Sequence, residues 1–129
     1  MDAASEVLAA NRRYYEAFEA ADLDAMAQIW ERSARVTCTH PGWPTRRSWG
    51  QVAASFFALF QGGALPQFLI TEEQVVVSGD TAWVSLDENL LGQHDGVTVA
   101  AVNIFVRDPA AARWAMVCHL GSAVQATLS

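Results

Sequence analysis

The sequence is poor in basic residues: eight stand against fourteen acidic ones, and the formal net charge is −6. Proteins that bind a phosphate backbone rely on basic patches, so this charge argues against nucleic acid as a partner. The pair Arg46-Arg47 is too small a cluster to change that conclusion.

Cysteines and metal-ligand patterns are equally scarce. Cys38 and Cys118 form no CxxC pair, and each lies in an apolar, strand-like context, which favours small buried side chains over a disulfide. His40, Cys118 and His119 could meet around a metal, but Cys118 and His119 are adjacent and are expected on opposite faces of a strand. His94 lies in a glycine-rich turn, far from them. No HxH or HExxH spacing occurs, so we expect neither a metal nor a cofactor.

Long apolar runs are absent too. No segment approaches the length of a membrane span, and the first residues lack the basic and apolar regions of a signal peptide. These absences predict a cytoplasmic protein with no membrane partner. Hydrophobic residues make up 52% of the chain and charged residues 17%, a composition that predicts one domain, residues 1–129, around one core.

Three helices are expected in the first half of the chain. Apolar residues at helical spacing predict the first over about residues 4–21, with Asp2 or Ser5 as its cap. Asp22 is expected to cap a short second helix over residues 23–30. Ser48 and Gln51 have the spacing of a capping box, so a third helix should begin at Ser48 and end at the glycine pair 62–63.

The second half of the chain reads as sheet. Extended runs over 67–78, 81–91, 97–107 and 113–124 are separated by short turns, and each run is longer than an average strand. A shorter strand over 36–40 precedes the third helix. The prediction is an α+β fold in which three N-terminal helices cover the concave face of a strongly curved, mostly antiparallel sheet. A cone of this kind has an open end, and small-molecule cavities are often found at such an opening.

The segment from Val36 to Pro44 draws particular attention. Val36, Cys38 and His40 alternate with threonines as in a half-buried strand, and Pro41-Gly42 then turns the chain below Trp43. This pattern predicts an imidazole and an indole in the lining of a cavity. The alternative is a stiff loop in which Trp43 is a lid over the core.

Strand alternation assigns the remaining candidates to faces. Glu88 shares a face with apolar residues and is expected inside the cone, although a register slip would instead place Asp87 and Asn89 there. Asn103 and Phe105 should also face inward. On the last strand, alternation predicts Met116, Cys118 and Leu120 inward and leaves Ala115, Val117 and His119 outward.

A family resemblance rests on several segments: Arg13-Tyr14, Ala21-Asp22-Leu23-Asp24, Trp30, the strand into His40-Pro41-Gly42-Trp43, and Trp114 to Ser122. Together they resemble the SnoaL-like proteins, whose superfamily includes nuclear transport factor 2, ketosteroid isomerase, scytalone dehydratase and the association domain of calcium/calmodulin-dependent kinases. The resemblance implies the cone-shaped fold over nearly the whole chain. It does not imply one activity, because this superfamily hosts isomerases, cyclases, dehydratases and assembly modules.

Ketosteroid isomerases supply three positions for comparison. Tyr14 matches their helical oxyanion donor, His40 before Pro41 stands near their general base but two residues further on, and Asn103 stands where they carry a second donor. Two of the three groups differ, so the steroid reaction itself is not implied. Each also has a structural alternative: Tyr14 as a core residue, Asn103 as a hydrogen bond across the cone, and His40 as a cap of the turn.

Two functions remain open at this point. The first is a cofactor-free enzyme that transfers a proton next to the carbonyl of a small apolar or aromatic molecule, with Tyr14, His40, Asn103 and Glu88 as catalytic groups. The second is a non-catalytic ligand-binding or assembly module. A homodimer through the convex sheet face is expected in either case, with Val102, Ile104 and Val117 near its centre. The predicted cavity walls are Phe18, Trp30, Trp43, Phe57, Phe60, Phe105, Met116, Cys118 and Leu120.

Overall fold

A computed structural model describes residues 2–63, 65–92 and 96–125 of the 129. Within these ranges the chain forms three helices and six strands. In chain order they are α1 (Ala3–Glu19), α2 (Leu23–Ile29), β1 (Thr37–Thr39), β2 (Arg46–Arg47), α3 (Ser48–Gln61), β3 (Gln67–Ser78), β4 (Thr81–Leu91), β5 (Thr98–Asp108) and β6 (Arg113–Ala123). No helix in these ranges is both long enough and apolar enough to cross a membrane.

The predicted helix starts are confirmed for α1 and α2 but only in part for α3. The carboxylates of Asp2 and Asp22 accept hydrogen bonds from backbone N–H groups three residues on, as N-caps do. At α3 the cap position is Arg47 rather than Ser48, and Ser48 has a φ of 70°. Gln51 still reaches back, but to the Arg47 N–H at 3.1 Å, so only this half of the predicted capping box forms.

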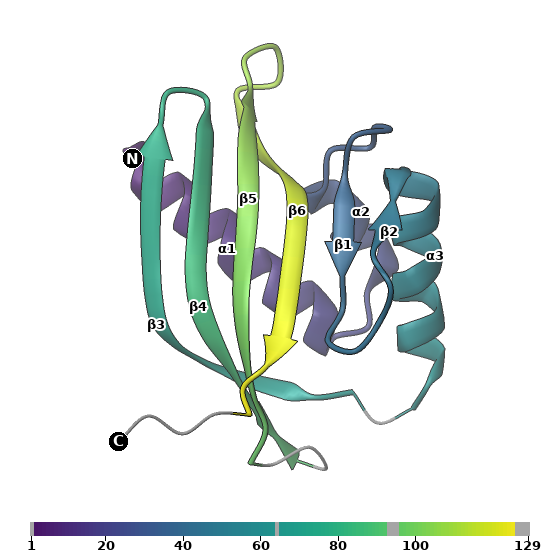
Figure 1. The fold of residues 1–129 in the computed structure, drawn as a ribbon. Helices are drawn as coiled ribbons and strands as arrows, with labels where there is room; N and C mark the ends of the chain where they lie inside the picture. The colour runs from purple at the N-terminus through teal and green to yellow at the C-terminus, as the bar shows by residue number, and fades with distance from the viewer. Residues whose placement is uncertain (1, 64, 93–95, 126–129) are drawn as a thin grey trace.

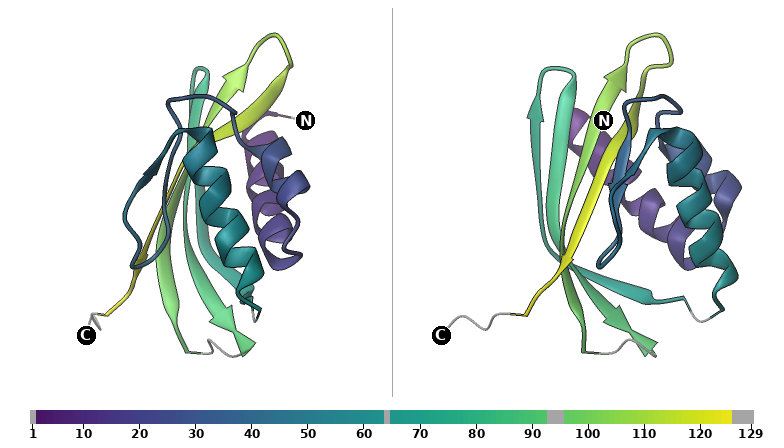
Figure 2. Two further views of the ribbon diagram at one scale, coloured as in Figure 1. Left: turned by 90° about the vertical axis from the view of Figure 1, so that its right-hand side faces the viewer. Right: turned by 45° about the vertical axis from the view of Figure 1, so that its right-hand side comes forward.

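The six strands form one mixed sheet in the order β2-β1-β6-β5-β4-β3. Neighbours are antiparallel except β1 and β6, which run parallel, so the expected mostly antiparallel meander is confirmed. The long strands bend, and the first part of β3 turns under the helices (Figure 1). All three helices lie on one side of the sheet (Figure 2). The predicted α+β cone is therefore the observed fold.

Alternation places most inward side chains where it was expected to. Val36, Cys38 and His40 are buried along β1 and its flanks. Glu88 is 4% exposed, while its neighbours Asp87 and Asn89 are only half-buried, so the face chosen for Glu88 is confirmed. Asn103 and Phe105 on β5 are fully buried, also as predicted.

The last strand differs from its predicted pattern because of a β-bulge. Phe105 pairs with Met116 but Ile104 pairs with Cys118, so Val117 is an extra residue that shifts the alternation by one. His119 is 2% exposed and Leu120 is 50% exposed. Met116 is inward as expected, but the inward placement of Cys118 and Leu120 was wrong, and so was the outward placement of His119.

Candidate functional site

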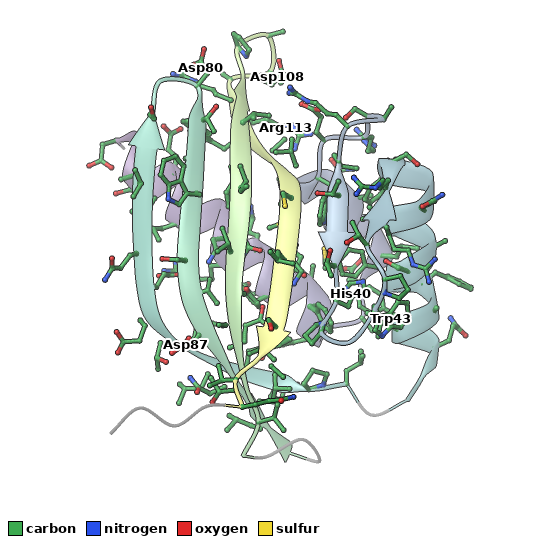
Figure 3. The ribbon with its side chains drawn as sticks, viewed as in Figure 1. His40, Trp43, Asp80, Asp87, Asp108 and Arg113 are labelled. Atoms are coloured by element: carbon green, nitrogen blue, oxygen red, sulfur yellow. The ribbon has the colours of Figure 1, made fainter. Side chains whose placement is uncertain are left out.

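A cavity of about 390 Å³ opens where α3 ends and β3 begins. That volume lies within the usual range for small-molecule sites. Among the described residues, its three titratable side chains are those of His40, which follows β1, Glu88 on β4 and His119 on β6. Figure 3 shows His40 and Trp43 on the chain after β1, beside α3. Most of the wall is apolar, with Phe18, Pro41, Trp43, Leu59, Phe68 and Leu90 as its larger side chains.

Glu88 is the acidic group of this cavity. Its Oε2 accepts a hydrogen bond of 2.7 Å from the Tyr15 hydroxyl. Burial raises the pKa of Glu88 from 4.5 to about 7, because the apolar surroundings penalise the charged carboxylate more than the Tyr15 hydrogen bond stabilises it. The carboxyl group is therefore present in both protonation states near neutral pH.

A chain of buried amides holds Tyr15 in place. Asn103 Nδ2 donates to the Tyr15 hydroxyl at 3.1 Å and to Asn11 Oδ1 at 2.8 Å. Asn11 in turn donates to Glu73 Oε2 on β3 at 3.0 Å. Both N–H bonds of Asn103 are thus engaged within the protein. Of the two interpretations of Asn103 that the sequence allowed, the structural hydrogen bond across the cone therefore fits better than the oxyanion donor.

His119 is held in one tautomer by the same network. Its Nδ1 lies 2.6 Å from Asn103 Oδ1, a contact in which the ring must donate because a carbonyl oxygen only accepts. Burial lowers the pKa of His119 to about 3, with a smaller contribution from His40, so the ring is neutral at pH 7. Its Nε2 then carries a lone pair, and this atom has no hydrogen-bond partner among the described residues.

His40 is fixed in a similar way by α3. Ser55 Oγ donates to the Val52 carbonyl at 2.7 Å, so its contact of 2.9 Å with His40 Nε2 makes the imidazole the donor. The lone pair of His40 is therefore on Nδ1, to which the Cys38 thiol can donate from 3.8 Å. Burial, and secondarily the charge of Arg46, lowers the pKa of His40 to about 4. Such an imidazole is a hydrogen-bond acceptor but only a weak base at neutral pH.

Tyr14 lies deeper than the cavity wall. Its ring packs against those of Tyr15 and His119, with centroid distances of 4.8 and 5.1 Å. The hydroxyl is buried and has no hydrogen-bond partner among the described residues. Burial, together with nearby Cys38, raises the pKa of Tyr14, so the hydroxyl keeps its proton.

The predicted aromatic walls are only partly those of the cavity. Phe18 and Trp43 line it, whereas Trp30, Phe105 and Met116 are fully buried in the core. Phe60 packs on the rings of Phe18 and Phe56 behind the wall.

Three predicted wall residues face away from the cavity. Phe57 is 55% exposed on the outer side of α3, so its predicted place was wrong, because Phe56 takes the buried helical position instead. The side chains of Cys118 and Leu120 project from the opposite face of the sheet, because the bulge at Val117 reverses the alternation along β6.

Three site residues were missed: His119, Tyr15 and Asn11. The bulge hid His119, which local sequence does not reveal. A signal for the other two exists, since Asn11 and Tyr15 are four residues apart and must share one helical face. No group of three or more His, Cys, Asp or Glu side chains within the described ranges is arranged to hold a metal, and His94 lies outside those ranges.

The chemistry available here is proton transfer in an apolar setting. One carboxyl group has a pKa close to neutrality, and two neutral imidazoles carry lone pairs, of which that of His40 lies beside the Cys38 thiol. Pairs of groups whose environments move their pKa values apart are typical of acid–base sites.

Comparisons with known proteins agree with this architecture. A family model described as SnoaL-like domain matches residues 7–126. A structure from Streptomyces avermitilis, provisionally described as a dehydratase of the NTF2-like family, is 33% identical with a TM-score of 0.87 over 95% of this chain and 96% of that one. No curated protein matches the chain.

Two further structures extend the likeness. One from Thiobacillus denitrificans, provisionally described as a calcium/calmodulin-dependent protein kinase type II association domain, is 28% identical, with a TM-score of 0.83 over 92% of this chain and 94% of that one. An NTF2-like protein from Cytophaga hutchinsonii has a TM-score of 0.75 over 98% of this chain and its own full length. At 14% identity it shows the shared fold alone.

Proposed function

Because the chain belongs to the SnoaL-like domain family, we propose that its cavity binds a small, largely apolar carbonyl compound and that Glu88 transfers a proton next to the carbonyl group. The reaction is of the isomerase, cyclase or dehydratase type and needs no cofactor. One observation carries the proposal: a buried carboxyl group with a pKa of about 7 faces an apolar cavity.

Glu88 takes the role of general acid and base in this proposal. As a carboxylate it removes a proton from the carbon beside the carbonyl, and as a carboxylic acid it returns that proton to another atom. Tyr15 fixes the carboxyl group through its hydrogen bond of 2.7 Å. With a pKa of about 4, His40 is too weak a base to share this task at neutral pH.

The two imidazoles orient the substrate. Nε2 of His119 can accept a hydrogen bond from a hydroxyl group of the substrate, and Nδ1 of His40 can do so where the substrate replaces its weak contact with the Cys38 thiol. If Glu88 passes the proton it removed to this hydroxyl group, the C–O bond breaks and water leaves, a dehydration, which accords with the provisional description of the Streptomyces avermitilis relative. Tyr14, expected as the oxyanion donor, does not line the cavity and its hydroxyl is buried, so we assign it no contact with the substrate.

A non-catalytic module of the same fold is the second candidate. The observation in its favour is the 28% identity to the structure described as a kinase association domain. In that case the cavity binds a ligand without chemistry, or the fold serves assembly.

We also propose that the chain forms a homodimer through the convex sheet face. On this face Leu69 is 55% exposed, Leu120 50% and Trp83 39%, beside half-buried Val102 and Ile104. Leu120 pairs with Val102 and Trp83 pairs with Ile104 on adjacent strands, and exposed apolar side chains grouped in this way favour burial against a second copy. Val117, expected at its centre, packs against the core instead.

Exchange of the α-protons of cyclic ketones and β-hydroxy ketones in D₂O, followed by ¹H NMR, tests the enzymatic proposal. The wild type should catalyse exchange for at least one compound, and Glu88→Gln should slow it by about 100-fold or more while binding persists. Asp87→Asn is the matched control, since Asp87 is the next residue along β4 on the opposite face (Figure 3). Binding without exchange would favour the second candidate, and an unchanged rate in Glu88→Gln would refute the role of Glu88.

A further inference from the structure

A β-bulge in β3 turns the side chain of Glu73 toward the helices. The register of β3 against β4 shifts between Thr71 and Gln74, so Glu72 and Glu73 together stand opposite a single residue of β4. A bulge of this kind re-aims the side chains of the bulged strand. The carboxylate of Glu73 reaches α1, where its Oε2 accepts a hydrogen bond of 3.0 Å from Asn11 Nδ2. Although Glu73 is exposed at the surface, its carboxylate thus ends a hydrogen-bond network that begins in the cavity.

Three successive hydrogen bonds connect Glu73 with the cavity, and all of them run in the same direction. His119 Nδ1 donates to Asn103 Oδ1 at 2.6 Å, and Asn103 Nδ2 donates to Asn11 Oδ1 at 2.8 Å. Asn11 Nδ2 then donates to Glu73. Asn11 and Asn103 are fully buried and His119 is 2% exposed, so these three side chains depend on one another for their partners.

The direction of this network has to be set at one of its ends. An amide fits in either orientation, because its oxygen accepts and its nitrogen donates, and a neutral imidazole can likewise donate or accept at Nδ1. The carboxylate of Glu73 only accepts. It therefore turns the nitrogen of Asn11 toward itself, and the oxygen of Asn11 in turn selects the nitrogen of Asn103. The oxygen of Asn103 is left for the Nδ1–H of His119, so Nε2 keeps its lone pair.

A second carboxyl group acts on the same network but fixes it less firmly. The Tyr15 hydroxyl accepts from Asn103 Nδ2 at 3.1 Å, so its one proton is left for Glu88. An ionised Glu88 demands this arrangement, whereas a protonated Glu88 can itself donate to Tyr15 and permits the reverse. With a pKa of about 7, Glu88 is present in both states near neutral pH. Glu73 is the acceptor that holds the direction in either state of Glu88.

We propose that Glu73 is a positioning residue of the cavity. Its carboxylate keeps Nε2 of His119 an acceptor and the Tyr15 hydroxyl a donor to Glu88. The inference rests on the proposed function, because it concerns the same site and specifies its ligand: a compound with a hydroxyl group that donates to His119, which lines the cavity. An analogue without that proton would leave the buried lone pair unpaired, and a site of this kind discriminates against such an analogue.

Glu73→Lys reverses the demand at the end of the network, because an ammonium group only donates. The two buried amides should turn over, and the proton of His119 should move from Nδ1 to Nε2. A ¹H–¹⁵N spectrum of the imidazoles at pH 6, where Glu88 is mainly protonated, distinguishes the two tautomers. Glu72→Lys is the matched control. Glu72 is exposed as well but lines a hollow on the convex face, so the same change of charge should leave the tautomer of His119 as it is.

Ligand binding shows the consequence in the cavity. Calorimetry should give 2-naphthol at least about a tenfold lower Kd than 2-methoxynaphthalene, which lacks the donor, in the wild type and in Glu72→Lys. The preference should disappear in Glu73→Lys, because His119 Nε2 then carries the proton and no longer accepts. Glu73→Ala removes the acceptor without adding a donor and should give a mixture of both His119 tautomers. Circular dichroism confirms that the variants are folded.

Three results would overturn the proposal: a wild-type His119 with its proton on Nε2, a tautomer that neither Glu73→Lys nor Glu73→Ala changes, and a tautomer that Glu72→Lys changes equally. Reversal of the tautomer in Glu73→Lys without any preference for 2-naphthol in the wild type rejects the proposed binding function alone. A preference in the wild type, together with an unchanged tautomer in both Glu73 variants, rejects the positioning role of Glu73 alone.

Discussion

The protonation of Glu88 should be visible in the stability of the protein. The pKa of this carboxyl group is raised from 4.5 to about 7, so the folded state keeps a proton that the unfolded chain releases. The stabilisation is complete below pH 4.5 and is lost as the pH rises through 7. At about 1.4 kcal/mol per pH unit between the two pKa values, the loss amounts to about 3 kcal/mol.

The two histidines act in the opposite direction. Their pKa values in the folded state, about 4 for His40 and about 3 for His119, lie below 6.5, so their contribution to stability is present above pH 6.5 and is lost as the pH falls. The pH dependence of the wild type alone therefore mixes both effects. Glu88→Gln removes only the carboxyl titration and keeps an oxygen that accepts from Tyr15.

The informative quantity is the difference in unfolding free energy between wild type and Glu88→Gln, measured by urea denaturation from pH 4 to pH 8. Wild type should lose about 3 kcal/mol relative to the variant across that range. A ¹³C NMR titration of the Glu88 carboxyl carbon should have its midpoint near 7. The control variant Asp87→Asn keeps the Glu88 carboxyl group, so it should lose the same stability relative to Glu88→Gln as the wild type does. A difference that does not change with pH, or a carboxyl midpoint near 4.5, would refute the argument that burial holds the proton on Glu88.

Two further predictions concern neighbouring tyrosines and assembly. Tyr15→Phe removes the hydrogen bonds to Glu88 and from Asn103 and should cost about 1–3 kcal/mol in urea denaturation, whereas Tyr14→Phe removes an unpartnered hydroxyl and should cost nothing. An equal loss in both variants would contradict the assigned network. Light scattering should give twice the mass of one chain, and Ile104→Asp should yield monomers while Phe57→Asp on the exposed side of α3 should not. A wild-type mass near 14.0 kDa at micromolar concentration would exclude the dimer.

Local chemistry explains which parts of the fold could be predicted. Asp2 and Asp22 cap helices because their carboxylates reach N–H groups three residues away, which the sequence alone reveals. Glu88 could be assigned to the inside of the cone because its strand alternates regularly over eleven residues. The short strand β2 lacked such a signal: two arginines show no periodicity, and only pairing with β1 makes them a strand.

The functional groups were harder to predict because they depend on contacts between distant segments. The extra residue Val117 reverses the face of everything after it on β6, and this one bulge replaces Cys118 and Leu120 in the interior by His119. His119 then meets Asn103, which is already bonded to Asn11 and Tyr15 on α1.

The roles of these side chains follow from their hydrogen-bond partners and their burial, and not from residue type alone. Asn103 was a plausible oxyanion donor by position, yet its two N–H bonds are spent on the helix and its carbonyl oxygen fixes the His119 tautomer. His40 was a plausible base by its ordinary pKa, yet burial lowers that pKa and leaves the imidazole neutral at pH 7. Burial also raises the pKa of Glu88, so Glu88 is the group that titrates near pH 7. In a buried site the hydrogen-bond partner decides which atom carries the proton, so a single-residue shift in one strand changes the chemistry that the whole cavity can perform.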